Sequence, residues 1–535
     1  MPENKSIRLK AAGLALAVLA PAALIAAWLR RRRPGLASHA RPEALGAAAQ
    51  PAPRQTAPAV AETRSWLALL ADEIRSDKAK TRQVAVAAIG VLITTWLGYA
   101  YARTIRVEGW QLWVWAACVI AVVAALMPRS RPALRIDKTW IVLLAVSLAA
   151  LLLRATSLET VPGGLHVDEL GVAGFALRHV YPPGGGGTHN PFITASVSQP
   201  ALFHYLIRLS LTLAGNSITG LRISSAIAGA LAVCATYAVV AVLRDRRTAL
   251  LGAALMAAYH YHVHWSRLGL NNIWDTLWAP LMLAAFAWGW RQRWSGGAVL
   301  AGIAVGLSQY FYAGGRIGLL LLALLIFQLW RRDRDRQRLI VHTGKLLATA
   351  AVIAAPLAMF ALRDPDNFFL RAREVYGWTP AEIRLVTGDP SRVGDFFWHQ
   401  LTRSIGAYTA FPDTTGFYGP GVPLLIGLAA PLFVLGGAWS IYKRQFMPVV
   451  WVLLTALLGG FLLASAPGSS HYVVSIPAIC WLVATPLSAL IETRRRRLIA
   501  LGLIGLSIIV VTDLYFYFGV YVPRGPVDLR FPFTP

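Results

Sequence analysis

Two adjacent carboxylates follow an apolar segment, in the stretch His166-Val167-Asp168-Glu169. Charged groups beside a membrane segment cost desolvation energy unless they are exposed to water, so their presence there indicates either a solvated loop or a function. A carboxylate at this place could take a proton from a hydroxyl group. Neighbouring side chains on a helix point about 100° apart, so only one of the two can aim at a given atom, and we expect Asp168 to do so. The alternative is that the pair caps a helix predicted over 170–177, whose dipole favours negative charge there.

Two further turns place arginines near the ends of apolar segments. In 265–275, Arg267 could bind a phosphate through paired hydrogen bonds, and Asp275 could orient that arginine or a ligand hydroxyl. An interfacial anchor and a helix cap are the alternative there. In 309–316, the turn carries Tyr310, Tyr312 and Arg316. For these residues the alternative is a snorkelling arginine within an aromatic belt.

The histidines are candidates for metal ligands. His260, His262 and His264 alternate in sequence, and the first and third share one helical face. No acidic or cysteine partner lies nearby in sequence, so we expect no metal site. His471 follows the tight turn 467–470 and could reach the same face as the arginines or simply cap a helix.

The composition is that of a membrane protein. Of 535 residues, 56% are hydrophobic and 14% charged, which a soluble protein of this size would not show. The net charge of +26 would suggest nucleic acid in a soluble protein, but here the cations lie between apolar segments, so we expect no nucleic-acid partner. The three cysteines fall in apolar runs and indicate neither disulfides nor a metal site.

Apolar runs long enough to cross a bilayer recur along the chain. If the loop after residue 158 lies outside, the short inner loops hold 20 lysines and arginines and the short outer loops hold four. This bias predicts an inner or plasma membrane protein with the acidic pair on the extracytoplasmic side. The predicted spans are an N-terminal anchor and 83–101, 109–127, 139–158, 222–243, 247–264, 273–290, 296–313, 316–330, 339–362, 421–441, 446–466, 470–491 and 498–518.

The segments outside the spans suggest a division of the chain. Residues 200–213 carry an apolar stripe that predicts an interfacial helix, and 363–420 mix charged and aromatic residues, as in a small cap. The predicted domains are a membrane anchor (1–33), a linker with an amphipathic helix or a solvated connector (34–82), two additional spans (83–138), the main bundle (139–518, with outer loops 159–221 and 363–420) and an outer tail (519–535).

The order of these features resembles the bacterial members of the protein O-mannosyltransferase and lipid A aminoarabinose transferase superfamily, which have the GT-C fold. The resemblance covers about 139–491 and is strongest over 161–290. Its motifs are the acidic stretch 166–169, the helix start at 199–205, the stretch 215–226, the turn 265–275 and the late turn 471–477. Residues 1–138 have no counterpart in this pattern.

The resemblance implies an all-α polytopic membrane protein, with a GT-C bundle, juxtamembrane helices and an outer cap. It also implies a glycosyltransferase that moves a sugar from a polyprenyl-phosphate carrier to an outer-face acceptor without a cofactor. Gln199 stands where some relatives have a lysine, and His471 where an arginine is usual. The residues and the resemblance together predict catalytic roles for Asp168 and Glu169, and substrate contacts from His166, Gln199, Arg267, Asp275, Tyr310, Tyr312, Arg316 and His471.

Two other functions share much of this pattern. A transporter or flippase of lipid-linked sugars would place charges near the bilayer midplane, whereas the charges here lie at the outer edge. A polymerase or ligase of lipid-linked saccharides would differ mainly in the size of its donor.

Overall fold

A computed structural model describes residues 78–524, except 131, 133–136, 196–198, 334, 376–377, 414–416 and 464–465. The predicted anchor, the linker up to residue 77 and the tail from residue 525 lie outside the described residues.

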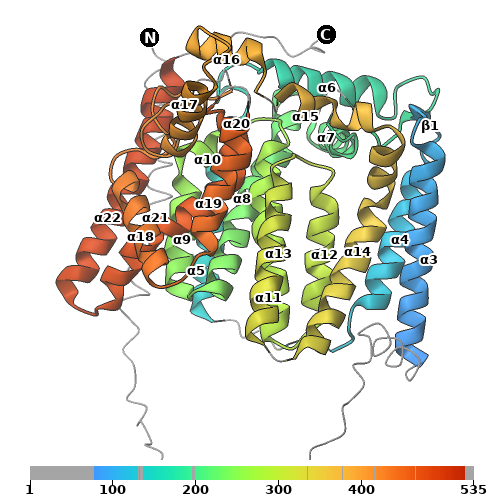
Figure 1. Ribbon diagram of the computed structural model, residues 1–535, viewed down its shortest axis with the longest axis horizontal. Helices are drawn as coiled ribbons and strands as arrows, with labels where there is room; N and C mark the ends of the chain where they lie inside the picture. Colours follow the sequence, from blue (N-terminus) through green and yellow to red (C-terminus); the bar gives the residue numbers. More distant parts are fainter. Residues whose placement is uncertain are drawn as a thin grey trace, which may run out of the picture.

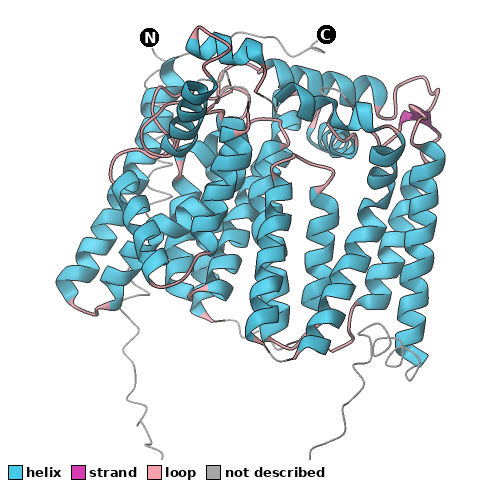
Figure 2. Cartoon of the chain, in the orientation of Figure 1, coloured by secondary structure: helices cyan, strands magenta, loops and turns pink. Residues whose placement is uncertain are grey.

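The described chain is a helical bundle with a layer of short helices over one end (Figures 1 and 2). The bundle consists of α3 (Lys78–Tyr101), α4 (Trp110–Leu126), α5 (Lys138–Ala155), α8 (Ile218–Leu243), α9 (Arg246–Ala258), α10 (His260–Trp265), α11 (Asp275–Arg291), α12 (Gly296–Ser308), α13 (Gly315–Arg332), α14 (Arg336–Arg363), α18 (Ala429–Tyr442), α19 (Met447–Ala456), α21 (Ile476–Glu492) and α22 (Arg496–Tyr515).

Six helical stretches are long and apolar enough to cross a membrane: α3, α5, α8, α14 and the continuous stretches Ser469–Glu492 and Arg496–Arg524. The chain is therefore a multi-pass membrane protein, as its composition predicts. Shorter apolar helices, such as α4, α12 and α18, fill the bundle between them.

Every predicted span between 83 and 518 contains a helix, but several are shorter or interrupted. The predicted span 247–264 is divided at Tyr259, where α9 ends and α10 begins. The span 446–466 passes from α19 into a π-helical turn, η3 (Leu457–Phe461). The span predicted from 421 starts only at Ala429, because the chain before it forms turns at Gly421 and Gly427, both with positive φ.

The layer over the end of the bundle contains α6 (Val167–His179), α7 (Leu202–Ala214), α15 (Pro365–Val375), α16 (Pro380–Thr387), α17 (Val393–Gly406) and α20 (Ser469–Tyr472) (Figure 1). In α7, the predicted interfacial helix, Phe203 and Ile207 are buried while Leu209 and Leu213 are exposed. Such a helix buries one face on the protein and can offer the other to a membrane surface. In the predicted cap, Trp378 packs edge-on against Phe396, at 5.4 Å between ring centroids.

A two-stranded antiparallel sheet ties the first two helices to this layer, a feature that we did not predict from the sequence. Strand β1 (Arg106–Val107), in the α3–α4 turn, pairs with β2 (Thr188–His189) in register Arg106 to His189. Asn190 extends the attachment by donating from Nδ2 to the carbonyls of Tyr101 (2.8 Å) and Thr104 (3.1 Å).

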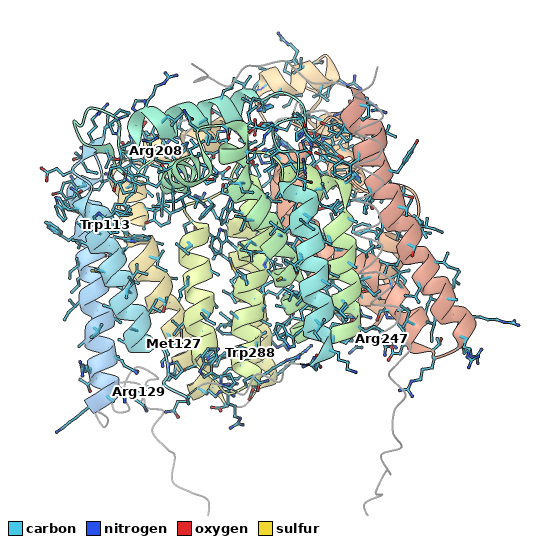
Figure 3. All side chains as sticks on the ribbon, turned by 180° about the vertical axis from the view of Figure 1, so that it is seen from behind. Trp113, Met127, Arg129, Arg208, Arg247 and Trp288 are labelled. Carbon is cyan, nitrogen blue, oxygen red and sulfur yellow. The ribbon has the colours of Figure 1, made fainter. Side chains whose placement is uncertain are left out.

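The cations that the topology prediction assigns to the inner side lie away from the layer of short helices. Figure 3 shows Arg129 and Arg247 at the opposite end of the bundle, whereas Arg208 of α7 lies at the end that carries α6. The acidic stretch and the predicted inner loops are thus at opposite ends of the molecule.

Candidate active site

The acidic stretch forms the first turn of α6. His166 is the N-cap residue, and its Nδ1 accepts a hydrogen bond from the backbone N–H of Asp168 at 3.1 Å. The His166 ring stacks on Phe417, with 4.3 Å between centroids. The Asp168 side chain is half-buried and makes no hydrogen bond or ion pair with any other residue that the structure describes. This carboxylate is therefore available to a ligand.

Glu169 is fully buried, and both of its oxygens are occupied. Oε1 accepts from Arg222 Nε (2.8 Å) and from the backbone N–H of Gly269 (2.7 Å). Oε2 accepts from Arg222 Nη2 (2.9 Å) and from the backbone N–H of His166 (3.1 Å). A carboxylate held by a two-point arginine contact and two amides fixes the start of α6. These contacts favour a positioning role for Glu169 and leave Asp168 to meet the substrate.

Three buried arginines bind backbone carbonyls near the acidic stretch: Arg222 and Arg267 bind the segment that leads into it, and Arg154 binds the end of α9. Arg222 also donates to the carbonyls of Leu158 (3.0 Å), Pro162 (3.0 Å) and Gly164 (2.6 Å). Arg154 donates to the carbonyls of Ala257 (2.9 Å) and Met256 (3.1 Å). The third is Arg267. The last carbonyls of a helix have no partners within it, and cations are favoured near them.

Arg267 differs from the prediction that it is open to a phosphate. It is 1% exposed, and its guanidinium donates to the carbonyls of Val161 (3.0 Å), Leu153 (2.5 Å), Thr156 (2.6 Å) and Ser157 (3.2 Å). Burial lowers the pKa of Arg267 to about 10, so it remains charged at neutral pH. In this structure Arg267 binds the carbonyls at the end of α5 and just after it. Its guanidinium is directed to these carbonyls, so the structure does not support the predicted contact with a phosphate.

The turn 266–275 connects the parts of the site. Gly269 can approach Glu169 because it lacks a side chain: a Cβ there would lie 2.5 Å from Cγ of Leu221. Asn271 Nδ2 donates to Gln199 Oε1 at 2.5 Å. Asn272 Nδ2 donates to the carbonyl of Ser470 at 3.3 Å, directly before His471. One turn thus contacts the acidic stretch, Gln199 and the late histidine turn.

A second group of predicted residues gathers at the start of α13. The Tyr312 hydroxyl and His471 Nδ1 are 2.8 Å apart, and Arg316 lies over the ring of Phe368 with 5.5 Å to its centroid. Both Tyr312 and Arg316 are half-buried, so they retain access to a ligand. The structure therefore brings the turn that carries Tyr312 and Arg316 to the late turn that carries His471.

Asp275 is buried below this group, 1% exposed. Its Oδ2 would lie 2.5 Å from a Cβ built on Gly314, and its Oδ1 3.0 Å from one built on Gly315. A carboxylate against the start of a helix is stabilised by the helix dipole. Asp275 is therefore placed to orient the turn that carries Arg316, whereas the sequence predicts that it orients Arg267 or a ligand hydroxyl.

Tyr310 is not part of the accessible site, contrary to the prediction that it contacts substrate. Its side chain is fully buried, and its hydroxyl donates to the carbonyl of Ile353 in α14 at 2.9 Å. The ring packs against Trp115, at 6.1 Å between centroids. The sequence could not separate Tyr310 from Tyr312, because both follow the end of α12 at Ser308, and only the packing against α4 and α14 buries Tyr310.

The alternating histidines have separate partners. His260 Nδ1 is 2.6 Å from the Tyr418 hydroxyl, His262 Nδ1 is 2.7 Å from Arg154 Nη2, and His264 Nε2 is 2.9 Å from the carbonyl of Phe417. Across the residues with described positions, no three His, Cys, Asp or Glu side chains gather in a group that could hold a metal.

Sequence reasoning missed Arg154, Arg222 and Phe417 as parts of the site. Arg154 and Arg222 each stand within or beside a long apolar run, and a charge in such a position is costly enough to indicate a function or a buried partner. The sequence therefore contained a signal for both arginines. It contained no signal for Phe417, because an aromatic residue in a loop belongs to no periodic pattern.

The fold and the site define a multi-pass membrane protein whose candidate catalytic carboxylate lies at one end of a helical bundle. Residues 198–360 match the family described as dolichyl-phosphate-mannose-protein mannosyltransferase. This match confirms, over that part of the chain, the resemblance drawn from the sequence motifs.

The similar proteins carry related names. An undecaprenyl phosphate-alpha-4-amino-4-deoxy-L-arabinose arabinosyl transferase of Pseudomonas aeruginosa is 29% identical over 273 residues, which are 49% of this chain and 44% of the relative. A Pseudomonas fluorescens protein of the same description is 24% identical over 333 residues, covering 58% of this chain and 55% of the relative. The matches thus span about half the length of these relatives. The crystal structure of ArnT from Cupriavidus metallidurans in the apo state has 13% identity and a TM-score of 0.47, covering 72% of this chain and 77% of that one.

Proposed function

We propose that this protein is a membrane glycosyltransferase that moves a sugar from a polyprenyl-phosphate carrier to an acceptor on the extracytoplasmic face. The observation that carries the proposal is the Asp168 carboxylate, which is unpaired among the described residues and is presented by a start of α6 that Glu169 and Arg222 hold rigidly. The names of the relatives, which refer to undecaprenyl phosphate and an arabinose, support a polyprenyl-phosphate donor and favour a pentose.

The proposed reaction is a direct displacement. The acceptor hydroxyl oxygen attacks the anomeric carbon, the bond from that carbon to the phosphate oxygen breaks, and polyprenyl phosphate leaves with the electron pair. Asp168 takes the proton of the hydroxyl as general base. Such a reaction inverts the anomeric centre, and we propose that it needs no resident metal or organic cofactor.

The donor phosphate is proposed to bind at the start of α13. Arg316 supplies positive charge there, and Tyr312 and His471 supply hydrogen-bonding groups 2.8 Å apart. Arg267, with its guanidinium directed to four backbone carbonyls, is assigned to hold the acidic stretch instead. The departure from relatives at His471 is thus offset by a partner tyrosine in this chain.

The test is Asp168→Asn in the full-length protein in membranes, with transfer of radiolabelled sugar from a polyprenyl-phosphate donor as readout. We expect transfer to fall by about 10²-fold or more, the usual contribution of a general base, without a change in unfolding temperature. Asp366→Asn is the matched control, since Asp366 is exposed on α15 and forms an ion pair with Arg373 at 2.8 Å. Full transfer by Asp168→Asn would refute the assignment.

Measurements on the wild-type protein separate the other two functions. A transporter or flippase would still move lipid-linked sugar across a vesicle membrane without breaking the sugar–phosphate bond. A polymerase or ligase would accept an oligosaccharide donor in preference to a monosaccharide. We expect wild-type protein to release polyprenyl phosphate from a monosaccharide donor, which a flippase would not do.

A further inference from the structure

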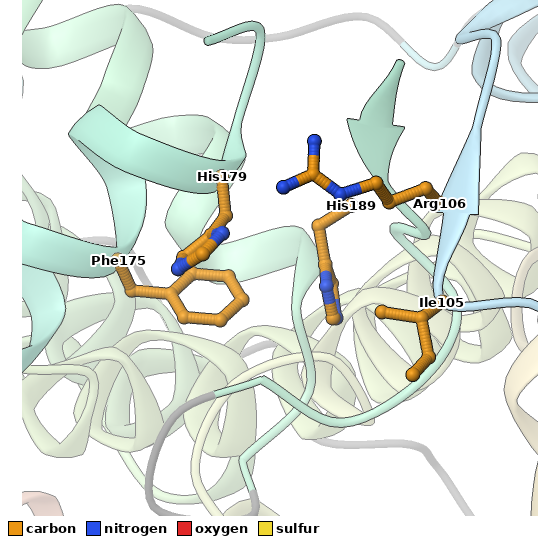
Figure 4. Close-up of a pocket in the computed structure, with 5 residues that line it drawn as sticks. All are labelled: Ile105, Arg106, Phe175, His179 and His189. Atoms are coloured by element: carbon orange, nitrogen blue, oxygen red, sulfur yellow. The ribbon is translucent and has the colours of Figure 1, made fainter. Parts of the chain in front are cut away.

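A cavity lies at the far end of α6 from Asp168, where the α3–α4 turn meets the outer layer. It has a volume of about 260 Å³ and is lined by Ile105, Arg106, Phe175, His179 and His189 (Figure 4). Its walls come from β1, α6 and β2. All of its lining residues precede the family match at 198–360.

The cavity has a rigid frame. The backbone pairing of Arg106 with His189 fixes two of its walls. The Tyr205 hydroxyl donates to the carbonyl of His189 and lies 2.9 Å from the Thr188 hydroxyl. Phe175 forms the floor, with its ring centroid 4.9 Å from that of His179 and 4.8 Å from that of His189. The groups at the rim are therefore held in place before any ligand binds.

The charge at the cavity is positive and uncompensated by its neighbours. Arg106 is exposed and makes no ion pair with any carboxylate in the described part of the chain; its Nη1 donates to the carbonyl of Gly186 at 3.5 Å. Figure 4 shows its guanidinium extending over the space between His179 and His189. A guanidinium beside two imidazoles repels a metal cation and attracts an anion.

The two imidazoles add hydrogen-bonding groups. His189 Nε2 lies 3.0 Å from the carbonyl of Thr194, which makes this nitrogen the donor and Nδ1 an acceptor that can bind the protonated oxygen of a hydrogenphosphate group. The His179 side chain has no hydrogen-bond partner within the described ranges. Arg106, His179 and His189 approach from three directions, an arrangement that suits a tetrahedral oxyanion better than a planar carboxylate.

We propose that this cavity is a binding site for a phosphate group, separate from the site of sugar transfer. The phosphate meets Arg106, His179 and His189, while Phe175 and Ile105 contact the apolar or carbohydrate part of the molecule that carries it. The proposal does not depend on the transferase activity. The phosphate belongs either to a lipid headgroup or to a soluble compound, and these sources require separate measurements.

The experiment uses the purified full chain and three variants. Arg106→Gln removes the cation, His179→Phe keeps the ring packing and removes the imidazole nitrogens, and Arg103→Gln is the matched control. Arg103 is an exposed arginine of the same turn, outside the cavity, that donates to the carbonyl of Arg363 at 3.0 Å. Because β1 pairs with β2 through the backbone, we expect all three to unfold at the wild-type temperature.

Binding is measured in two arms. In the first, inorganic phosphate is titrated into protein in detergent and followed by ³¹P NMR. In the second, protein in phosphatidylcholine nanodiscs with or without phosphatidic acid is analysed by native mass spectrometry for retained lipid. Saturation by inorganic phosphate alone indicates a soluble ligand, and retention of phosphatidic acid indicates a lipid headgroup.

We expect Arg106→Gln to weaken binding about tenfold or more and His179→Phe about three- to tenfold, as for the loss of a charged and a neutral hydrogen bond. Arg103→Gln should bind like wild type. Equal binding by Arg106→Gln and wild type, equal losses in Arg106→Gln and Arg103→Gln, or no saturable binding in either arm would overturn the proposal. None of these results depends on whether sugar transfer is observed.

Discussion

The contrast between Asp168 and Glu169 gives the sharpest prediction. Glu169→Gln keeps the shape of the side chain but removes its charge and places an NH2 group against N–H donors. Removing one partner of a buried ion pair leaves the other charge uncompensated, at a cost of about 3–5 kcal/mol. Both side chains of the Glu169–Arg222 pair have no exposed surface, so solvent cannot reduce this cost.

The free energy of unfolding of the detergent-solubilised protein is measured by denaturant titration with tryptophan fluorescence as readout. The control is Glu374→Gln, which breaks an ion pair with Arg371 of similar length, 3.1 Å, but with 46% and 51% of the side chains exposed. An exposed pair contributes about 0–1 kcal/mol, so this variant should unfold almost as wild type does.

We expect Glu169→Gln to lose both stability and transfer, and Asp168→Asn to lose transfer alone. The reasoning is refuted if Glu169→Gln unfolds like Glu374→Gln while abolishing transfer, because Glu169 would then act on the substrate and the contact with Arg222 would carry little stability.

Three further results are expected. Tyr310→Phe should cost about 0.5–1.5 kcal/mol of unfolding free energy, the net contribution of one hydrogen bond, because Trp115 Nε1 still donates to the carbonyl of Ile353 at 3.0 Å; the KM for the donor should be unchanged. Gly436→Ala should lower the unfolding temperature more than Gly437→Ala, because only at Gly436 would a Cβ meet the carbonyl oxygen of Leu482, at 1.9 Å. Burial, with a smaller contribution from Arg106, lowers the pKa of His189. The contribution of neutral His189 to stability is therefore complete above about pH 6.5 and is lost as the pH falls below that value. In ¹H–¹³C NMR titrations, Arg106→Gln should raise the pKa of His189.

The sequence by itself determined the class of protein and the place of the acidic pair. Long apolar runs must be helices in a membrane, since every backbone polar group there needs an internal partner. The length of these runs and the cations between them were enough to locate the helices and to put His166, Asp168 and Glu169 beside a span. The helices α6 and α7 and the cap were also predictable, because amphipathic spacing is a local property.

Only the tertiary structure decided what each polar residue does. The two carboxylates are equivalent in sequence, but Arg222, 53 residues later, reaches Glu169 and not Asp168. Arg267 looked available until the fold brought it to the end of α5, more than 100 residues earlier in the chain. Local sequence shows that a charged side chain lies near the membrane. Whether that side chain can bind a ligand depends on helix packing, because packing decides which distant backbone carbonyls and amides come within hydrogen-bonding distance of it.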